Sequence, residues 1–270
     1  MARRGVMMEK VVSKMAFRPK NDLRYEIKFL VNLAQQQALI EELSANLQPD
    51  THGDDGQYLV NSLYYDTRDY KAYWDKVDGF DLRRKIRLRI YGNEPVLPTT
   101  PVYLEIKARV GNRMAKRRLQ LTYAEALILT GQEEAPETFA PALQSEADRP
   151  VYDELDYLFS ALRLQPTCVV SYQRLAYGGH AYYPDLRITF DTLVRGRTSN
   201  LSLLSADAGT LYTILEPGWA ILEVKVNRTM PHWLGELLSR HYCTPRRISK
   251  YCATLERCSA IRGRQHIIMS

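Results

Sequence analysis

The chain has 270 residues, of which 45% are hydrophobic, so it can bury a sizeable core and does not have the composition of a disordered protein. Its 37 lysines and arginines exceed its 31 aspartates and glutamates, which gives a formal net charge of +6. That balance is compatible with a polyanionic partner: nucleic acid, a nucleotide, a phosphate chain or a membrane surface.

Residues 1–22 form a basic leader, which we expect to be a flexible arm. Glu9, Lys10 and Lys14 interrupt its apolar residues, so it lacks the continuous apolar core of a secretory signal. No apolar run approaches the ~20 residues that a bilayer-spanning helix needs. The sequence therefore predicts a cytoplasmic location.

Strand-forming segments dominate the first half of the chain. We predict strands at 23–31, 57–67, 82–91, 102–110 and 113–121. Between the first two, Asn32 is a typical N-cap residue for a helix over 33–46, where leucine and isoleucine recur at helical spacing. The residues "VGNR" at 110–113 predict a tight turn between the last two strands.

The second half predicts further strands at 167–177, 186–194 and 219–226. Helices are expected before Gly131, over 151–164, and in the two C-terminal segments "MPHWLGELLSRHY" and "RRISKYCATLERC". No repeat or Gly/Ser linker divides the chain, so we expect one domain over 23–258 and a flexible tail over 259–270. The four cysteines lack metal-site spacing and predict free thiols in a reducing compartment.

Charged and aliphatic residues alternate along several predicted strands. In "KIRLRIY" at 85–91, three cations share one face and three aliphatic residues the other. For a single strand, a solvated outer face is the usual explanation. The alternation recurs on six or seven strands, whose charged faces carry eleven cations: Lys28, Lys85, Arg87, Arg89, Lys107, Arg109, Lys116, Arg118, Arg174, Arg187 and Lys225. Four carboxylates accompany them: Glu26, Glu105, Asp191 and Glu223.

The recurrence favours an inward direction for the charged faces. The aliphatic faces need cover, which helices can supply on the outside of a barrel. About eight strands are predicted, and eight strands close a barrel with an interior wide enough for a small ligand. Because buried charges cost several kcal/mol each unless they are paired or solvated, the charged interior predicts a wet tunnel and not a packed core. The predicted class is α+β.

The excess of cations suits a polyphosphate or a nucleoside triphosphate, because arginine makes bidentate contacts with phosphate and lysine supplies a mobile charge. The four carboxylates have two interpretations. They are salt-bridge partners, or they are oxygen ligands for Mg²⁺ or Mn²⁺ beside a phosphate site. For Asp191 and for Asp66, capping of a turn is a third.

Eight short motifs, in order, carry a family resemblance: "YEIKF", "SLYYDT", "KIRLRIYG", "YLEIKAR", "SYQRLAY", "LRITFDT", "ILEVKV" and "RRISKYC". The series resembles the polyphosphate polymerase (VTC) domain of the vacuolar transporter chaperone complex, within the triphosphate tunnel metalloenzyme superfamily. The resemblance covers about residues 23–255. It implies a closed antiparallel eight-stranded β-barrel tunnel with flanking helices, and a C-terminal helix at one mouth.

The resemblance also implies residue roles. The cations that hold nucleotide and chain phosphates match Lys28, Arg87, Arg89, Lys107, Arg174 and Arg187. The basic residues of the C-terminal helix match Arg247 and Lys250. The metal-binding glutamate falls on Glu223, with Glu26 and Glu105 as further metal candidates. We expect Lys85, Arg109, Lys116, Arg118 and Lys225 to contribute to substrate binding.

The resulting hypothesis is a metal-dependent polyphosphate polymerase that uses ATP and either Mn²⁺ or Mg²⁺. Hydrolases of the superfamily begin with Glu-x-Glu-x-Lys, whereas Arg24 replaces the first glutamate here. A triphosphatase of the same fold is the first alternative. A non-catalytic module for polyphosphate or RNA is the second, with nucleic acid ranked last as a partner. The sequence leaves the choice of metal and the oligomeric state open.

Overall fold

The computed structural model describes residues 24–137, 139–179, 182–204, 209–258 and 260–261. The expected arm over 1–22 therefore lies outside the described residues, as does most of the expected tail over 259–270. Within the described part, no helix is both long enough and apolar enough to cross a bilayer. The four cysteines are free thiols, as the sequence predicted.

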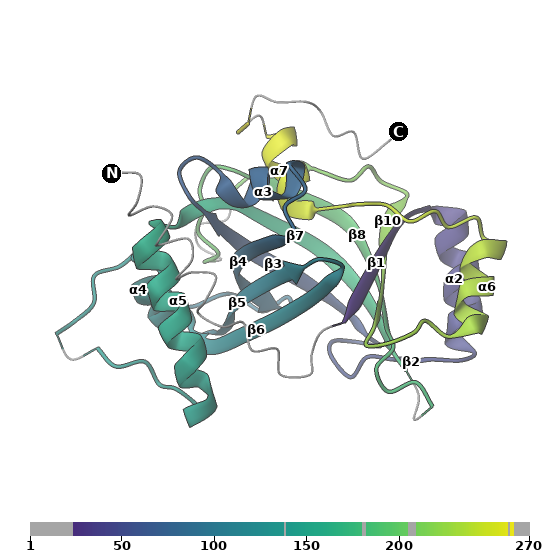
Figure 1. Ribbon diagram of the computed structural model, residues 1–270, viewed down its shortest axis with the longest axis horizontal. Helices are drawn as coiled ribbons and strands as arrows, with labels where there is room; N and C mark the ends of the chain where they lie inside the picture. Colours follow the sequence, from purple (N-terminus) through teal and green to yellow (C-terminus); the bar gives the residue numbers. More distant parts are fainter. Residues whose placement is uncertain (1–23, 138, 180–181, 205–208, 259, 262–270) are drawn as a thin grey trace.

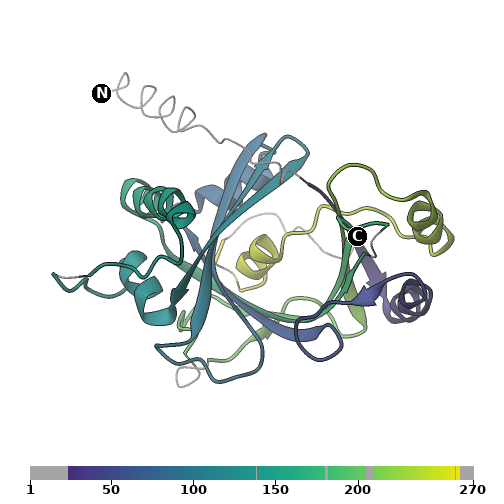
Figure 2. The ribbon, with the colours of Figure 1, turned by 90° about the horizontal axis from the view of Figure 1, so that it is seen from below.

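The centre of the fold is one strongly curled antiparallel sheet (Figures 1 and 2). Its main path runs β1-β10-β8-β7-β3-β4-β5-β6. These eight strands are β1 (Tyr25–Asn32), β3 (Gln57–Asp66), β4 (Leu82–Tyr91), β5 (Pro101–Val110), β6 (Arg113–Thr122), β7 (Gln165–Gly178), β8 (Arg187–Arg197) and β10 (Trp219–Val226). Two-residue strands, β2 (Gln48–Pro49) and β9 (Tyr212–Thr213), pair with β7 and β8.

The expected closed barrel is wrong for the described residues, because the sheet curls into a half-barrel whose edge strands β1 and β6 meet at one bridge. Arg24 and Met114 exchange two backbone hydrogen bonds, of 3.1 and 3.0 Å. On one side of this pair, β6 reaches its turn with β5 at Gly111. On the other side, the partner residues precede Arg24 and lie outside the described part. Within the described residues, the pairing of β1 with β6 is therefore limited to this bridge.

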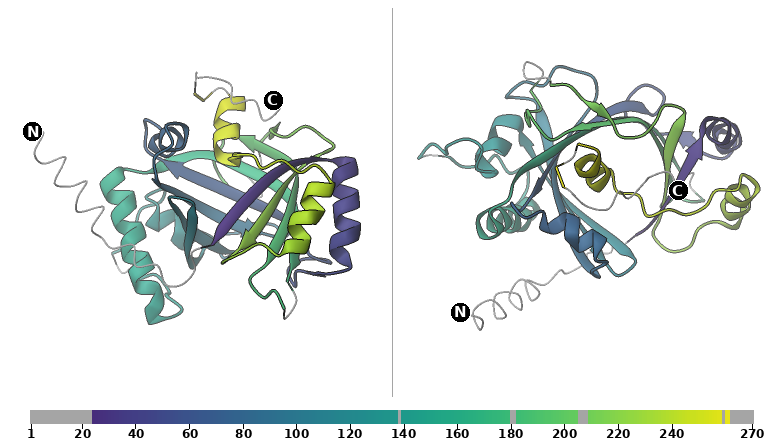
Figure 3. Two further views of the ribbon diagram at one scale, coloured as in Figure 1. Left: turned by 45° about the vertical axis from the view of Figure 1, so that its right-hand side comes forward. Right: turned by 90° about the horizontal axis from the view of Figure 1, so that it is seen from above.

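Two pairs of helices cover opposite sides of the curled sheet (Figures 1 and 3). The first pair is α2 (Leu33–Ser44) and α6 (His232–Arg240), and the second is α4 (Tyr123–Leu129) and α5 (Arg149–Leu162). A 3₁₀ turn, η1 (Glu146–Asp148), leads into α5, and α3 (Lys71–Val77) follows β3. Asn32 caps α2 as predicted, because its side chain accepts from Gln35 N at 2.9 Å and the Gln35 side chain accepts from Asn32 N at 3.0 Å.

The predicted alternation places the aliphatic faces outward. Ile86, Leu88 and Ile90 of β4 pack in one core with Leu155 and Phe159 of α5. A second core joins phenylalanines and aliphatic residues of β1, β8 and β10 to leucines of α2 and α6. Since opposite faces of a strand alternate, the charged residues of these strands face the inside of the curl. This part of the prediction is confirmed.

The last helix, α7 (Lys250–Arg257), lies at one open end of the curled sheet, over its interior (Figures 1 and 3). It is shorter than the predicted segment 246–258, because the Ser249 side chain caps it by accepting from Cys252 N. The preceding segment runs beside β1 instead, where Arg246 N donates to Lys28 O at 2.7 Å. Gly196 of β8 permits close approach of α7, since a Cβ there would lie 2.6 Å from Thr254 Cγ2.

Candidate functional site

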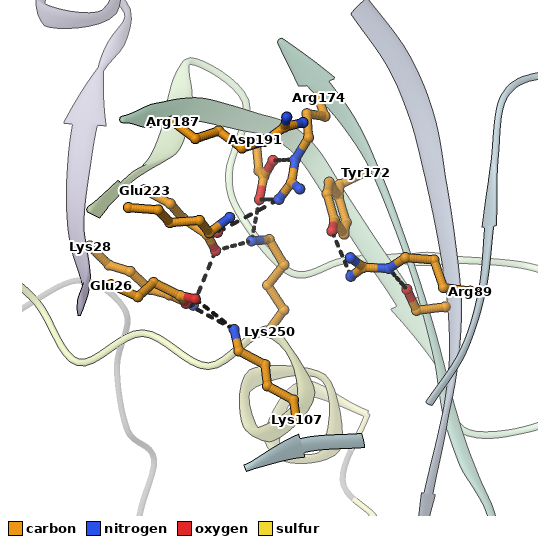
Figure 4. A network of polar contacts seen from close by, with 12 residues as sticks. Glu26, Lys28, Arg89, Lys107, Tyr172, Arg174, Arg187, Asp191, Glu223 and Lys250 are labelled. Atoms are coloured by element: carbon orange, nitrogen blue, oxygen red, sulfur yellow. Dashed lines mark hydrogen bonds and ion pairs between the residues drawn. The ribbon is translucent and has the colours of Figure 1, made fainter. Parts of the chain in front are cut away.

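The charged faces of five strands meet the start of α7 in one ion-pair network (Figure 4). We call it the interior network. Its members are Glu26 and Lys28 of β1, Lys107 of β5, Arg174 of β7, Asp191 of β8, Glu223 and Lys225 of β10, and Lys250 of α7. Only the antiparallel curl brings β1 and β10 opposite β5, so the network is a product of tertiary structure.

Glu223 lies at the middle of the interior network and is 4% exposed. Its Oε1 contacts Lys28 at 3.1 Å and Lys250 at 3.3 Å, and its Oε2 contacts Lys225 at 2.9 Å. Arg174 lies 3.7 Å from Oε2. Burial raises the pKa of Glu223, but the surrounding cations, led by Lys225, outweigh it and hold the pKa well below its usual range.

Asp191 is fully buried and binds Arg174 in a bidentate pair of 2.7 and 2.8 Å. Lys250 reaches the same carboxylate at 2.5 Å. Burial opposes ionisation of Asp191, yet Arg174 and Lys250 lower its pKa overall. The aspartate therefore fixes the head groups of two cations that come from a strand and from α7.

Lys107 meets both oxygens of Glu26, at 2.8 and 3.0 Å, and Lys28 contacts the same carboxylate at 3.2 Å. Burial lowers the pKa of Lys107 to about 7, although Glu26 raises it. The ammonium of Lys107 is thus the buried charge in the network that is most easily lost near neutral pH.

A second cluster, the arginine group, adjoins the interior network. It comprises Arg87, Arg89, Glu105 and Lys116. Glu105 is fully buried and accepts from Arg87 at 2.7 and 2.8 Å, and its Oε1 forms an ion pair with Lys116 Nζ at 2.5 Å. Arg89, 4% exposed, donates to the hydroxyls of Ser62 and Tyr172 at 3.1 and 3.0 Å and lies 3.9 Å from Glu105.

Tyr172 joins the two clusters. Its hydroxyl accepts from Arg89, while its ring lies beneath Lys250 at 4.7 Å and Arg174 at 5.3 Å (Figure 4). We refer to the two clusters together as the charged interior. It holds eight cationic side chains against four carboxylates. Because unneutralised buried charge is costly, this excess indicates a site for an anion.

The remaining predicted residues lie apart from these clusters. Arg187 pairs with Asp50 and donates to Tyr58 Oη at 3.0 Å. Lys85 donates to Ser249 Oγ at 2.7 Å, and Arg118 covers the ring of Tyr103 at 4.5 Å.

Two residues that were predicted to bind substrate lie outside the charged interior. Arg109 turns to the β5–β6 turn, where it donates to Gly111 O at 2.7 Å. Arg247 is exposed and precedes α7, whereas Lys250 is the first residue of this helix, and a role of either in substrate binding stays a prediction.

The sequence matches the VTC domain family over residues 23–258. The chain belongs to this family. A search of curated proteins gave no match.

Solved structures similar to this VTC domain include three with low sequence identity. A protein of Pyrococcus horikoshii OT3 is 13% identical, with a TM-score of 0.44, and 87% of this chain aligns with 99% of that one. A putative adenylate cyclase of Bacillus halodurans is 14% identical, with a TM-score of 0.47 and coverages of 84% and 94%. A putative Hippeastrum adenylyl cyclase, described as having a dominant triphosphatase activity, is 13% identical, with a TM-score of 0.46 and coverages of 86% and 94%. At these TM-scores the likenesses support no further conclusion.

The carboxylates of this VTC domain do not fit a metal ion held by protein ligands alone. Among the described residues, no group of three or more His, Cys, Asp or Glu side chains is placed to bind one. The ammonium of Lys28 lies between Glu26 and Glu223, at 3.2 and 3.1 Å, where a shared ion would have to sit. A metal role for Glu26, Glu105 and Glu223 therefore stays a prediction.

The predicted site residues did not include four polar residues that adjoin the charged interior of the VTC domain: Ser62, Tyr64, Tyr172 and Thr189. Tyr64 Oη accepts from Arg87 at 3.1 Å. Strand parity contained the signal, since Tyr172 has the parity of Arg174, and Thr189 that of Asp191. Counting ionisable residues alone passed over neutral groups on the same faces.

Proposed function

We propose that this VTC domain is a polyphosphate polymerase, which binds ATP and a polyphosphate chain in the charged interior. The observation that carries the proposal is the excess of cations, eight against four carboxylates, on the faces that eight of its elements present to one another. A triphosphate supplies several negative charges and many acceptor oxygens in a short length. Arginine and lysine bind such a group better than they bind isolated carboxylates.

In this proposal, phosphate oxygens replace the carboxylate partners of the cations. Arg87 and Arg89 of β4 and Arg174 of β7 offer planar donor groups, and Lys28, Lys107 and Lys250 add mobile charges. A terminal oxygen of the polyphosphate chain attacks the γ-phosphorus of ATP. The bond from that phosphorus to the β–γ bridging oxygen breaks, and ADP leaves with its electron pair.

The acceptor is already anionic, so the transfer needs no general base. The described histidines agree with this, because His52 pairs with Asp50 and because His232 and His241 lie on or beside α6. Rate enhancement would come from alignment of donor and acceptor and from fixed positive charge around the transferred group.

The test is product analysis after incubation of the purified protein with ATP and either Mn²⁺ or Mg²⁺. Arg89→Gln is the variant of choice, and Arg117→Gln is its matched control, since Arg117 faces outward on β6 and pairs with Glu154 at 2.5 Å. A ladder of polyphosphate on a gel supports the polymerase. Orthophosphate alone indicates a triphosphatase, and polyphosphate binding without turnover indicates a binding module.

We expect Arg89→Gln to raise the barrier by about 2–4 kcal/mol, as loss of an oxyanion donor does. Arg117→Gln should retain the wild-type rate, because it lies outside the charged interior. A rate loss in Arg89→Gln of less than about threefold would contradict the role of Arg89, since each tenfold corresponds to about 1.4 kcal/mol.

A further inference from the structure

A buried hydroxyl on β8 has no hydrogen-bond partner among the described residues. Thr189 is fully buried, and its Oγ1 neither donates to nor accepts from any of them. Leaving a buried hydroxyl unpaired costs free energy, and such groups in native proteins generally have a partner. The hydroxyl of Thr189 is therefore a buried hydrogen-bond donor that has no acceptor among the described residues.

Strand register places Thr189 on the inner face of the sheet. It lies directly opposite Glu223 of β10 and Ala176 of β7. Residues directly opposite one another in antiparallel strands share a face. Thr189 therefore faces the same side as Glu223, into the charged interior.

Thr189 and its neighbour on β7 are shorter than the charged side chains of the register pairs on either side of them. Two short side chains, Thr189 and Ala176, lie side by side, whereas the neighbouring positions carry long charged ones. Lys225 and Arg187 form the next register pair on one side, and Arg174 and Asp191 form the next on the other. A phosphate lying over the short side chains would have cations on both sides and the hydroxyl beneath it.

We propose that the Thr189 hydroxyl binds the substrate, by donating a hydrogen bond to a phosphate oxygen of the bound triphosphate or polyphosphate chain. The inference rests on the proposed function, which it deepens by adding a neutral donor to the cations. A hydroxyl complements these cations because its O–H group donates a hydrogen bond in a defined direction and does not titrate. The ammonium of Lys225, by contrast, lies on a flexible side chain and supplies charge without a fixed hydrogen-bond direction.

Thr189→Val tests the proposal, because valine keeps the shape and removes the hydroxyl. The measurement pairs calorimetric titration of the full chain with tripolyphosphate, without metal, with the thermal midpoint of the unliganded protein. We expect affinity to fall about tenfold, the usual effect of one hydrogen bond to a charged group. The midpoint should stay the same or rise, because the substitution removes an unpaired buried polar group. Thr189→Ser keeps the hydroxyl and should keep most of the affinity.

Thr130→Val is the control for loss of a buried threonine hydroxyl outside the charged interior. Thr130 Oγ1 donates to Ala126 O at 2.8 Å on α4, so this variant should lower the thermal midpoint and leave affinity unchanged.

Affinity of Thr189→Val within about twofold of wild type would overturn the inference alone, because one hydrogen bond to phosphate is worth more than that. A fall in affinity together with a lower midpoint, shared by Thr189→Ser, would overturn it in favour of a packing role. Wild-type protein that fails to bind tripolyphosphate would overturn the proposed function and, with it, this inference.

Discussion

At the scale of single residues, the charged interior is governed by competition between burial and pairing. Glu26, Asp191 and Glu223 stay ionised because the cations outweigh the cost of burial. Lys107 shows the opposite balance, since burial lowers its pKa to about 7 in spite of Glu26. Two members of one ion pair thus respond differently to pH, and Lys107 is the one that titrates in the physiological range.

Lys107 predicts a pH dependence of ligand binding. A bound polyanion favours the ammonium form, so the pKa of Lys107 rises on binding and a proton is taken up above pH 7. Affinity for tripolyphosphate should therefore fall above pH 7, by at most about tenfold per pH unit from this group. Titration calorimetry at pH 7 and pH 9 checks the trend in affinity. The number of protons taken up on binding is obtained by repeating the titration in buffers of different ionisation enthalpy.

Lys107→Arg is the comparison for this trend, because the guanidinium keeps its charge throughout the range. The variant should lose most of the decline. An equally steep decline in Lys107→Arg would assign the titration to another group. In the unliganded protein, the unfolded chain binds more protons than the folded one between pH 7 and the ordinary lysine pKa, so Lys107 makes the free energy of unfolding rise with pH across that window.

At the scale of elements, α7 depends on a few specific contacts for its place at the open end of the curl. Asp66, at the end of β3, accepts from the backbone N–H groups of Ala72 and Tyr73 of α3 at 2.9 and 3.2 Å. It also accepts from Tyr251 Oη of α7 at 2.5 Å. Asp66 therefore holds the first turn of α3 and ties α7 to the sheet beside Lys250.

Loss of the Tyr251 hydroxyl should loosen this tie. Tyr251→Phe leaves Asp66 with its backbone donors and removes one buried hydrogen bond, so we expect the free energy of unfolding to fall by about 1–2 kcal/mol. Urea denaturation measures the change. Tyr182→Phe is the control, because Tyr182 is 89% exposed and should be neutral. Equal stability of Tyr251→Phe and wild type would mean that Asp66 does not hold α7.

The close approach of α7 to β8 makes a second prediction. Gly196→Ala would place its Cβ 2.6 Å from Thr254 Cγ2 and 2.9 Å from the backbone oxygen of Val169. We expect a loss of about 1–3 kcal/mol, typical of overpacking. Gly178→Ala is the matched control, since a Cβ there meets nothing within 4 Å. Chemical denaturation measures the free energy of unfolding of both variants. An unchanged free energy of unfolding in Gly196→Ala would show that α7 can shift away from β8 without loss of stability.

Most elements could be predicted because their signals are local. Alternation in "KIRLRIY" identified β4 and the face that its cations take, and Asn32 identified the start of α2. The start of α7 was placed too early, because the segment before Ser249 bonds along β1, a contact that no local pattern records. Arg109 has the parity of an inner residue, but it lies next to a turn, where backbone acceptors are closer than the interior.

At the scale of the whole molecule, sequence could supply the number of main strands but not the closure of the sheet. Closure of the sheet depends on the stagger between its edge strands β1 and β6. This stagger accumulates from the register of every neighbouring strand pair between them. The interior network has the same origin, because Glu26 and Lys107 lie 81 residues apart and meet only through the curl. The composition of the chain predicts an anionic ligand. Only the structure shows that each of the four carboxylates is paired with cations.

The charge balance of the molecule predicts how ligands stabilise it. Tripolyphosphate alone should raise the free energy of unfolding by about 2.7 kcal/mol at a concentration 100 times its dissociation constant. Mn²⁺ alone should not, because Glu26 and Glu223 are occupied by lysines. Thermal unfolding with each additive, and with both, checks this. Stabilisation by Mn²⁺ alone would establish a metal site that does not need phosphate.

The lysine that lies between Glu26 and Glu223 gives the protein the properties of an ion exchanger. Without ligand, the cations of the charged interior already hold counterions that are covalently part of the chain. An incoming anion must displace those carboxylates, which stay close by and repel it. A negative charge alone is then not sufficient for a ligand to bind. We expect the protein to select ligands by charge density, so that a linear phosphate chain, which carries charge on every unit, displaces the carboxylates and a single phosphate does not.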